Sequence, residues 1–433
     1  MAESISRHWY ALVDGNNFYV SCERAFSPRL QGRPVGVLSN NDGCIIARSD
    51  ELKALGVRMG TPPHQIRSLV RRHKIKLLSS NYSLYADMSR RLNDLLSEFC
   101  PEVQPYSIDE SFVRMTGFYA DGLLEQGRQI EAAAHQWLHL PVSVGIAPTR
   151  TLAKLANRCA KQRTQNKTFL LDADSAATQA LLKATPVDQV WGIGSKLAKR
   201  LEAMGIETAW QLREAPLEWI AQRFSVVLQR TQLELRGIEA TPAASTAEGR
   251  QQLRVSRTFG SPCRLEQDCL EAVQHYVQRA AEKLRAQRSE TSAMTVFLRT
   301  NPYRSDLPQF SESLVWQFDQ PTDDTTEMLQ VARRLLRRLW QPGYVYQKAG
   351  VLLMDLTSKA RRQQVLFETP ERQIQKARNE RLMQVIDTLN QQQGRGKVGF
   401  GLPRKEAAWP MRQANRSPEY TTDWADLPEV VAR

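Results

Sequence analysis

Three carboxylates in two separated stretches are the first candidates for chemistry. Asp14 follows an apolar run, and Asp109 and Glu110 are adjacent in the alternating stretch VQPYSIDESFVRM. Neighbours in a strand point to opposite faces, but a bulge or a sheet edge lets both reach one site. Two unit charges about 4 Å apart repel by about 4 kcal/mol at an effective dielectric of 20, so such a cluster needs a proton or a cation. Oxygen ligands suit Mg²⁺, and two such ions suit phosphoryl transfer.

The elements around these carboxylates alternate between strands and helices. HWYALVDG predicts a strand, PVGVLSNNDGCIIARS a hairpin with Asn-Asp-Gly supplying the positive φ of its turn, and YSLYADMSRRLNDLLSEFC a helix. A second hairpin carries the Asp-Glu pair, and a further helix and the strand PVSVGIA follow. This order predicts a mixed sheet with helices packed on one face, as in the split βαβ arrangement.

The rest of the chain predicts a helical region and a second mixed region. Residues 186–236 are helix-rich, TPAASTAEG at 241–249 has linker composition, and 254–356 mixes strands and helices again. After Ser358 the chain becomes rich in Arg and Gln, which predicts weak order with a helix at ERLMQVIDTLN. The fold class is therefore α+β and multidomain.

DQVWGIGSKLAKRLEAMGI at 188–206 is typical of a helix-hairpin-helix. Gly192 and Gly194 permit close backbone approach, and their amides with the next helix N-terminus suit a DNA phosphate. Lys196 and Lys199 add charge. Contacts of this kind are independent of base sequence and sensitive to salt.

Composition narrows the class of partner. The 59 Lys and Arg against 46 Asp and Glu give a net charge of +13, which suits a polyanion. No apolar run approaches the roughly 18 residues of a membrane span, and the N-terminus lacks the pattern of a signal peptide. The six cysteines form no CxxC pair, so we expect reduced thiols, a cytoplasmic location and no membrane partner.

Four stretches together carry a resemblance to a known family. DGNNFYVSCE, NNDGCIIARSDELKALGVRMGTP, YSIDESF and VSVGIAPTRTLAKLAN occur in this order. The chain thereby resembles the Y-family of translesion DNA polymerases, and within it the UmuC type, the catalytic subunit of bacterial DNA polymerase V. The resemblance runs nearly end to end, as far as SPEYTT.

The resemblance implies residue roles in the active site. Asp14, Asp109, Glu110 and the carbonyl of Gly15 would hold two Mg²⁺ ions, with Mn²⁺ as a substitute. The first three would be the catalytic residues. The nucleotide pocket would comprise Phe18, Tyr19, Arg48, Lys53 and Lys161. Tyr19 would be the steric gate against a ribose 2′-hydroxyl, and Lys53 and Lys161 would hold the triphosphate. Asp50 stands where many relatives have Tyr, and we expect it to lie outside the site.

The resemblance also implies a right-hand polymerase. It would have a ferredoxin-like palm, small fingers, a helical helix-hairpin-helix thumb and an α+β little finger. The expected ranges are 8–26 and 78–172 for the palm, 27–77 for the fingers, 173–240 for the thumb, 250–358 for the little finger and 359–433 for a C-terminal tail. Arg257, in the first strand of the little finger, would contact DNA.

The tail carries the expected partner sites. Gln363, Leu366 and Phe367 match the Q-x-x-L-F pattern accepted by bacterial sliding clamps. The last residues resemble the segment through which relatives engage a UmuD′-like dimer and RecA. The other partners would be primer-template DNA and a deoxynucleoside triphosphate.

The function implied is error-prone, template-directed translesion DNA synthesis in the SOS response, without proofreading, by a DNA-directed DNA polymerase. Two alternatives stay open. A non-catalytic checkpoint scaffold binding DNA, RecA and the clamp would not need the carboxylates or Tyr19. A two-metal nuclease would use the carboxylates but leave Tyr19 and the triphosphate lysines unexplained.

Overall fold

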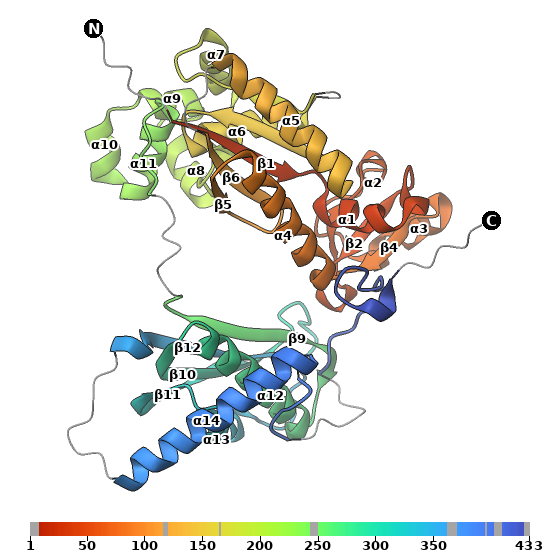
Figure 1. Cartoon of the computed structure of the whole chain (residues 1–433), viewed down its shortest axis with the longest axis vertical. Coiled ribbons are helices and arrows are strands. Elements are labelled where there is room, and N and C mark those ends of the chain that lie inside the picture. The colour runs from red at the N-terminus through yellow and green to blue at the C-terminus, as the bar shows by residue number, and fades with distance from the viewer. Residues whose placement is uncertain are drawn as a thin grey trace. The chain divides into compact units, whose positions relative to one another are not determined.

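The computed structural model describes residues 8–115, 120–163, 166–242, 250–361, 370–394, 396–401 and 409–427. The chain divides into two compact units (Figure 1). Unit 1 comprises residues 1–245 and 415–433, and unit 2 comprises residues 246–414. The main chain therefore passes between the units twice.

A five-stranded sheet is the centre of unit 1. Its order is β5-β6-β1-β7-β8, with β8 parallel to β7 and the other pairs antiparallel. The strands are β1 (Trp9–Gly15), β5 (Glu102–Pro105), β6 (Glu110–Met115), β7 (Val142–Ala147) and β8 (Thr168–Leu170). The helices of this region are α1 (Phe18–Phe26), α4 (Tyr82–Phe99), α5 (Ala120–Leu138) and α6 (Arg150–Lys161).

Both faces of this sheet are buried, because helices pack on each. The alternate residues Trp9, Ala11 and Val13 of β1 join one core with side chains of α4 and α5. Tyr10 and Leu12 join a second core with side chains of α6 and the helices that follow. The prediction of helices on one face was therefore wrong, since α6 covers the second face.

A smaller three-stranded sheet has the order β3-β2-β4. Its elements are β2 (Val35–Leu38), β3 (Ile45–Arg48), β4 (Lys76–Ser79), α2 (Asp50–Ala54) and α3 (Arg67–His73). The predicted hairpin is confirmed, because β2 and β3 pair antiparallel. Its positive φ angles, however, fall at Asn41 and Asp42 and not at Gly43.

Five short helices follow in unit 1: α7 (Ala176–Ala184), α8 (Ser195–Glu202), α9 (Ala209–Glu214), α10 (Leu217–Arg223) and α11 (Val226–Leu235). Their apolar side chains continue the core beneath α6. Single 3₁₀ turns occur at Pro28–Leu30, Asn40–Asp42, Pro63–Ile66, Val187–Gln189, Lys359–Arg361 and Trp424–Asp426.

Unit 2 is an antiparallel sheet of order β11-β10-β12-β9. Its strands are β9 (Leu253–Cys263), β10 (Ser289–Thr300), β11 (Ser311–Thr322) and β12 (Tyr346–Ser358). The helices α12 (Glu266–Ala286) and α13 (Thr325–Leu339) supply most of its core partners. A long helix, α14 (Pro370–Gln393), confirms the predicted helix at 380–390 and extends it at both ends.

The α+β multidomain class is confirmed by these sheets and helices. The expected range boundaries stay predictions. The end of the expected tail belongs to unit 1, which its polar composition did not indicate. Among the helices that the structure describes, none is long and apolar enough to cross a membrane.

Candidate active site

Asp14 and Glu110 face each other across two antiparallel strands. They are register partners in the β1–β6 pair, and Asp14 is only 4% exposed. Burial, then the hydrogen bond with Glu110, raises the pKa of Asp14 to about 7. Burial acts to raise the pKa of Glu110 too, but hydrogen bonds with Asp14 and Lys154 outweigh it and lower that pKa. The two carboxyl groups therefore share a proton near neutral pH when no cation is bound.

Helix α6 brings two ammonium groups to this pair. Lys161 Nζ donates to Asp14 Oδ2 over 2.7 Å, and Lys154 Nζ donates to Glu110 Oε2 over 2.5 Å. The two lysines are seven residues apart, so they share a helix face. Lys161 was predicted here, but Lys154 was not. The signal that could have identified Lys154 is this seven-residue spacing.

Close packing holds α6 against the sheet. Asn157 lies between the two lysines and donates to the carbonyls of Leu12 and Ser143, over 3.1 and 2.7 Å. A Cβ on Gly145 would lie 2.0 Å from the Asn157 backbone nitrogen, so only glycine permits this approach. The helix is therefore fixed by contacts that the lysines do not make.

Asp109 and Gly15 lie beside the pair in a different arrangement. Asp109 is in the turn before β6, where its carboxylate accepts from Ser107 Oγ over 2.5 Å. Its carbonyl accepts from the Gly15 amide over 2.8 Å. Within the described residues, no three His, Cys, Asp or Glu side chains form a group that could hold a metal ion. The structure thus brings Asp14 and Glu110 together without Asp109, whose role stays a prediction.

The donor set nevertheless fits a hard divalent cation. Asp14 and Glu110 present oxygen donors, and the raised pKa of Asp14 records the cost of a second buried negative charge there. A divalent cation would remove that cost.

The two aromatic residues after Asp14 occupy different environments. Phe18 is 3% exposed and belongs to the core, where it packs so closely on Gly15 that a Cβ there would lie 2.7 Å from its ring. Tyr19 is half-buried and stacks on Tyr85, with ring centroids 4.5 Å apart and planes 14° apart. Tyr19 is therefore the aromatic residue available to a nucleotide.

The two fingers residues predicted for the pocket already have protein partners. Arg48 Nη1 donates to the Val57 carbonyl over 2.7 Å. Lys53 Nζ donates to Asp50 Oδ1 over 2.9 Å, and Asn17 donates to the same oxygen over 3.2 Å. Asp50 thus joins the first helix to Lys53. The expectation that Asp50 lies outside the nucleotide site stays a prediction.

The helix-hairpin-helix residues are exposed on the described surface. Gly192 has φ of 86°, Gly194 caps α8, and Lys196 and Lys199 point to solvent from that helix. The preceding Trp191 donates to the hydroxyl of Tyr106 over 3.1 Å. Lys154 Nζ lies 4.4 Å from the Tyr106 ring centroid. The hairpin is therefore in contact with the same lysine that pairs with Glu110.

Arg257 and Arg254 lie on opposite faces of β9. Arg257 lies on the same face of the strand as the core residues Val255 and Phe259, and its Nη1 is 3.6 Å from Met411 Sδ. Arg254 lies on the other face, 4.6 Å from the Phe297 ring centroid. Burial and the charges of Arg254 and Arg299 lower the pKa of Lys348. Arg254, Arg299 and Lys348 therefore bring three basic groups together on one face of the sheet, while the predicted DNA contact of Arg257 stays a prediction.

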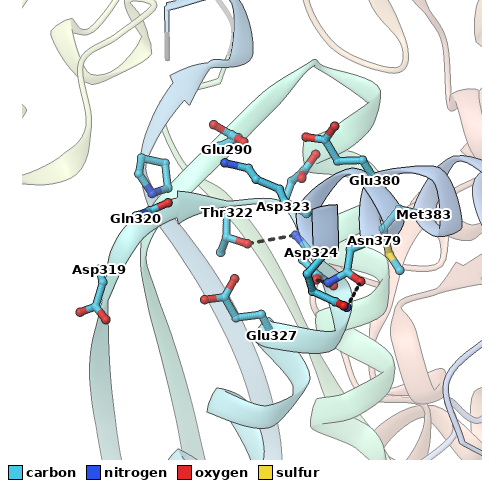
Figure 2. Close-up of a pocket in the computed structure, with 13 residues that line it drawn as sticks. Glu290, Asp319, Gln320, Thr322, Asp323, Asp324, Glu327, Asn379, Glu380 and Met383 are labelled. Carbon is cyan, nitrogen blue, oxygen red and sulfur yellow. Dashed lines mark hydrogen bonds between the residues drawn. The ribbon is translucent and has the colours of Figure 1, made fainter. Parts of the chain in front are cut away.

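A hollow of about 250 Å³ in unit 2 lies between β11, α13 and α14. In Figure 2 the carboxylates of Glu290, Asp323 and Glu380 gather at one end of it. Asn379 of α14 donates to Asp324 over 2.6 Å at its floor. None of the predicted functional residues lines this hollow, and its acidic lining would repel a nucleotide or a DNA phosphate.

The predicted clamp motif, with Gln363, Leu366 and Phe367, lies outside the described residues.

Comparisons with known proteins show the family to which the chain belongs. Residues 13–158 match the impB/mucB/samB family, 250–366 its C-terminal domain, 175–206 the helix-hairpin-helix motif of that family, and 380–430 a domain of unknown function. ImpB of Salmonella typhimurium is 42% identical over 97% of this chain and 99% of its own. UmuC of Salmonella typhimurium is 40% identical over 97% and 100%.

More distant relatives show the same class. DNA polymerase IV of Pelotomaculum thermopropionicum is 28% identical over 83% of this chain and 88% of its own. The structure of a Y-family DNA polymerase chimera covers 81% of this chain and all of its own, with a TM-score of 0.61 at 19% identity. The right-hand polymerase fold predicted for the chain is thereby confirmed.

The fold and the site define a Y-family DNA polymerase, an enzyme of the translesion class that binds DNA and deoxynucleotides. Within that class the chain belongs to the impB/mucB/samB family, and it is similar to UmuC over nearly its whole length.

Proposed function

We propose that this DNA polymerase adds deoxynucleotides to a primer 3′-hydroxyl with two divalent cations, opposite damaged templates in the SOS response. The cations would be Mg²⁺, or Mn²⁺ in its place, held by Asp14, Asp109, Glu110 and the Gly15 carbonyl. The observation that carries the proposal is the buried Asp14–Glu110 pair with Lys161 and Lys154 beside it.

The chain's own residues prepare the site for a polyanionic substrate. Bound cations would offset the charge of the triphosphate and of the attacking oxygen. Asp14 would have to be deprotonated to hold a cation. The Lys161 side chain is 43% exposed, so it can leave Asp14 and pair with a phosphate. The Lys53 side chain is equally exposed, so it can leave Asp50 in the same way. Arg48 would add a further positive charge to the nucleotide pocket.

Tyr19 would select the sugar. Its stack on Tyr85 and its edge contact with Tyr82 fix the ring on two sides. A fixed ring cannot move aside for a 2′-hydroxyl, so a ribonucleotide would clash with it. Phe18 would support Tyr19 from the core.

Two surfaces would bind primer-template DNA. The hairpin at Gly192 and Gly194 offers backbone amides with the charges of Lys196 and Lys199 beside them. In unit 2 the face of Arg254, Arg299 and Lys348 offers a second basic surface. Arg257, also predicted to contact DNA, would do so from the opposite face of β9, beside Met411. Both contacts would be with phosphates and therefore independent of sequence.

The remaining parts of the proposal concern fidelity and partners. We propose synthesis without proofreading, as the resemblance to the Y-family implies. Gln363, Leu366 and Phe367 would bind a sliding clamp. The last residues of the chain would engage a UmuD′-like dimer and RecA. A clamp pull-down with Leu366 and Phe367 changed to Ala tests the motif, and retained binding would contradict it.

Primer extension opposite an abasic template site tests the central proposal. Asp14→Ala and Asp109→Ala should abolish extension, because each removes a proposed ligand. Asp94→Ala is the matched control, since Asp94 is an exposed acid on α4 of the same unit. Primer degradation that depends on Asp14 would support a nuclease instead. Primer extension by both the Asp14→Ala and the Asp109→Ala variant would contradict the proposed metal site. DNA binding without either activity, in the presence of RecA and a UmuD′-like protein, would support a scaffold.

A further inference from the structure

The last described segment of the chain packs on unit 1. Residues 415–420 run beside the end of β4, near the dark blue C-terminal turn in Figure 1. The Ser79 amide donates to the Asn415 carbonyl over 2.9 Å, and the Asn415 amide donates to Ser79 Oγ over 3.0 Å. Tyr420 stacks on Phe26 of α1, with centroids 5.1 Å apart and planes 10° apart. Both ends of the segment are therefore anchored.

Between these anchors the segment satisfies a buried amide. Asn81 is fully buried and caps α4, accepting from the Leu84 amide. Its Nδ2 donates to the carbonyls of Ser417 and Pro418, over 3.2 and 3.0 Å. A buried polar group without such partners costs about 1–3 kcal/mol, so the tail completes this part of unit 1.

The tail also reaches a buried carboxylate. Glu23 is 1% exposed, and its Oε1 accepts from Ser417 Oγ over 3.0 Å and from Tyr85 Oη over 2.7 Å. Burial raises the pKa of Glu23, while these two hydrogen bonds act to lower it. One carboxylate oxygen thus joins the C-terminal segment to Tyr85.

Tyr85 carries the connection to the nucleotide pocket. Its ring is fully buried and forms the stacking surface for Tyr19. Its hydroxyl is held by Glu23, and Glu23 is held in turn by Ser417. Ser417, Glu23, Tyr85 and Tyr19 therefore form a continuous series of contacts from the tail to the nucleotide pocket. Because the interior is close-packed, a shift of Glu23 must move Tyr85 and the ring stacked on it.

We propose that residues 415–420 are a positioning element for sugar discrimination, in which Ser417 fixes Tyr85, and through it Tyr19, by way of Glu23. The inference rests on the gate role proposed above for Tyr19. Ser417 is a positioning residue, since it acts through Glu23 and Tyr85 rather than on the substrate.

The test compares incorporation of ribonucleotides and deoxynucleotides by the full-length chain, in the assembly that supports extension by the parent. Ser417→Ala should raise the ribonucleotide-to-deoxynucleotide ratio of kcat/KM about two- to tenfold, the equivalent of one hydrogen bond. Ser417→Thr retains the hydroxyl and should restore the parent ratio. Trp424→Ala is the control in the same tail, because Trp424 is 89% exposed, and it should leave the ratio unchanged.

A double-mutant cycle with Tyr85→Phe tests the route. This substitution keeps the ring that stacks on Tyr19 and removes the hydroxyl that Glu23 holds. It should raise the ratio by itself, and Ser417→Ala should then add little to it. Full additivity would overturn the route through Tyr85. If Ser417→Ala does not fold, Tyr85→Phe alone tests the proposal. A ribonucleotide-to-deoxynucleotide ratio in Tyr85→Phe equal to that of the parent would then overturn it.

Tyr19→Ala separates this inference from the proposed function. A raised ratio in Tyr19→Ala with a parent ratio in Ser417→Ala would overturn the tail's role and leave the gate intact. If Tyr19→Ala has the same ribonucleotide-to-deoxynucleotide ratio as the parent, Tyr19 is not the steric gate, and the positioning role proposed for the tail is then also wrong.

Discussion

The Lys161 ammonium donates to the buried Asp14 carboxyl over 2.7 Å. Its charge acts to lower the pKa of Asp14, but burial and the hydrogen bond with Glu110 act more strongly in the other direction. One lysine therefore does not compensate the charge of two facing carboxylates. This residual cost is the physical reason for expecting a cation at the pair, and it has consequences for stability.

Asp14→Asn should stabilise the metal-free protein at pH 8 and have less effect at pH 5. The pKa of Asp14 rises from 3.8 to about 7 on folding. The folded chain thus holds a proton that the unfolded chain has lost, and stability falls as pH rises through about 7. Asparagine carries no such charge. A gain of about 1 kcal/mol would raise Tm by about 2–4 °C, measured by thermal unfolding in EDTA. An equal effect at both pH values would contradict the shared proton.

Lys154→Ala should reduce the Mg²⁺ concentration needed for half-maximal extension. Lys154 pairs with Glu110, so its charge competes with a cation for the same oxygen. Removing a partly buried pair of this kind should change the requirement by about two- to fivefold. A Mg²⁺ titration of the extension rate measures this. Lys183→Ala is the matched control, since Lys183 is an exposed lysine of α7 in the same unit and lies outside the proposed site. An unchanged requirement in Lys154→Ala would show that Lys154 does not compete.

Gly145→Ala should destabilise the protein by about 3 kcal/mol and reduce extension. The added methyl group would meet the Asn157 backbone and push α6 away from the sheet. Both lysines of the site would move with the helix. Urea unfolding gives the change in free energy. Gly122→Ala, in helix α5 with open space around the added carbon, is the control and should be neutral or stabilising by up to about 1 kcal/mol. Equal stability of the two variants would contradict the close approach of α6.

The sequence predicted most strands of the five-stranded sheet because the signals there are local. The strand ending at Asp14 and the hairpin before Glu110 follow from their hydrophobic patterns, and the structure pairs them in register. Lys154 was missed because its seven-residue spacing from Lys161 indicates a shared helix face, but not which carboxylate that face meets on the sheet. The sequence also did not show which face of β9 the helices cover, so it could not place Arg254 and Arg257 on opposite faces.

The packing of the tail could not be predicted for a different reason. Ser417 and Asn415 are polar residues in a polar stretch, and their partners Glu23, Ser79 and Asn81 lie more than 300 residues earlier. Local composition therefore indicated weak order. The buried polar groups of unit 1, which need partners, and the Phe26 ring on which Tyr420 stacks explain why this segment packs there.

Tyr19→Ala should raise ribonucleotide incorporation at least about tenfold, because the excluding side chain is removed. Tyr19→Phe is the control, since it keeps the ring that stacks on Tyr85. Single-nucleotide primer extension with matched ribo- and deoxynucleotides measures the ratio. Unchanged sugar discrimination in Tyr19→Ala would remove the gate assignment.

Arg254→Ala should weaken primer-template binding more than Arg257→Ala does. Arg254 lies on the sheet face that also bears Arg299 and Lys348, whereas Arg257 lies on the core side against Met411. Because Arg254 would pair with one phosphate, its replacement by Ala should reduce the slope of log affinity against log salt by about 1. Binding titrations from low to moderate salt, with an extended or damaged template, measure both slopes. The two residues belong to the same strand and carry the same charge, so the change in net charge is matched between the variants. A larger decrease in affinity in Arg257→Ala would mean that the chain binds DNA on the face that Met411 covers, and Met411 would then have to move when DNA binds.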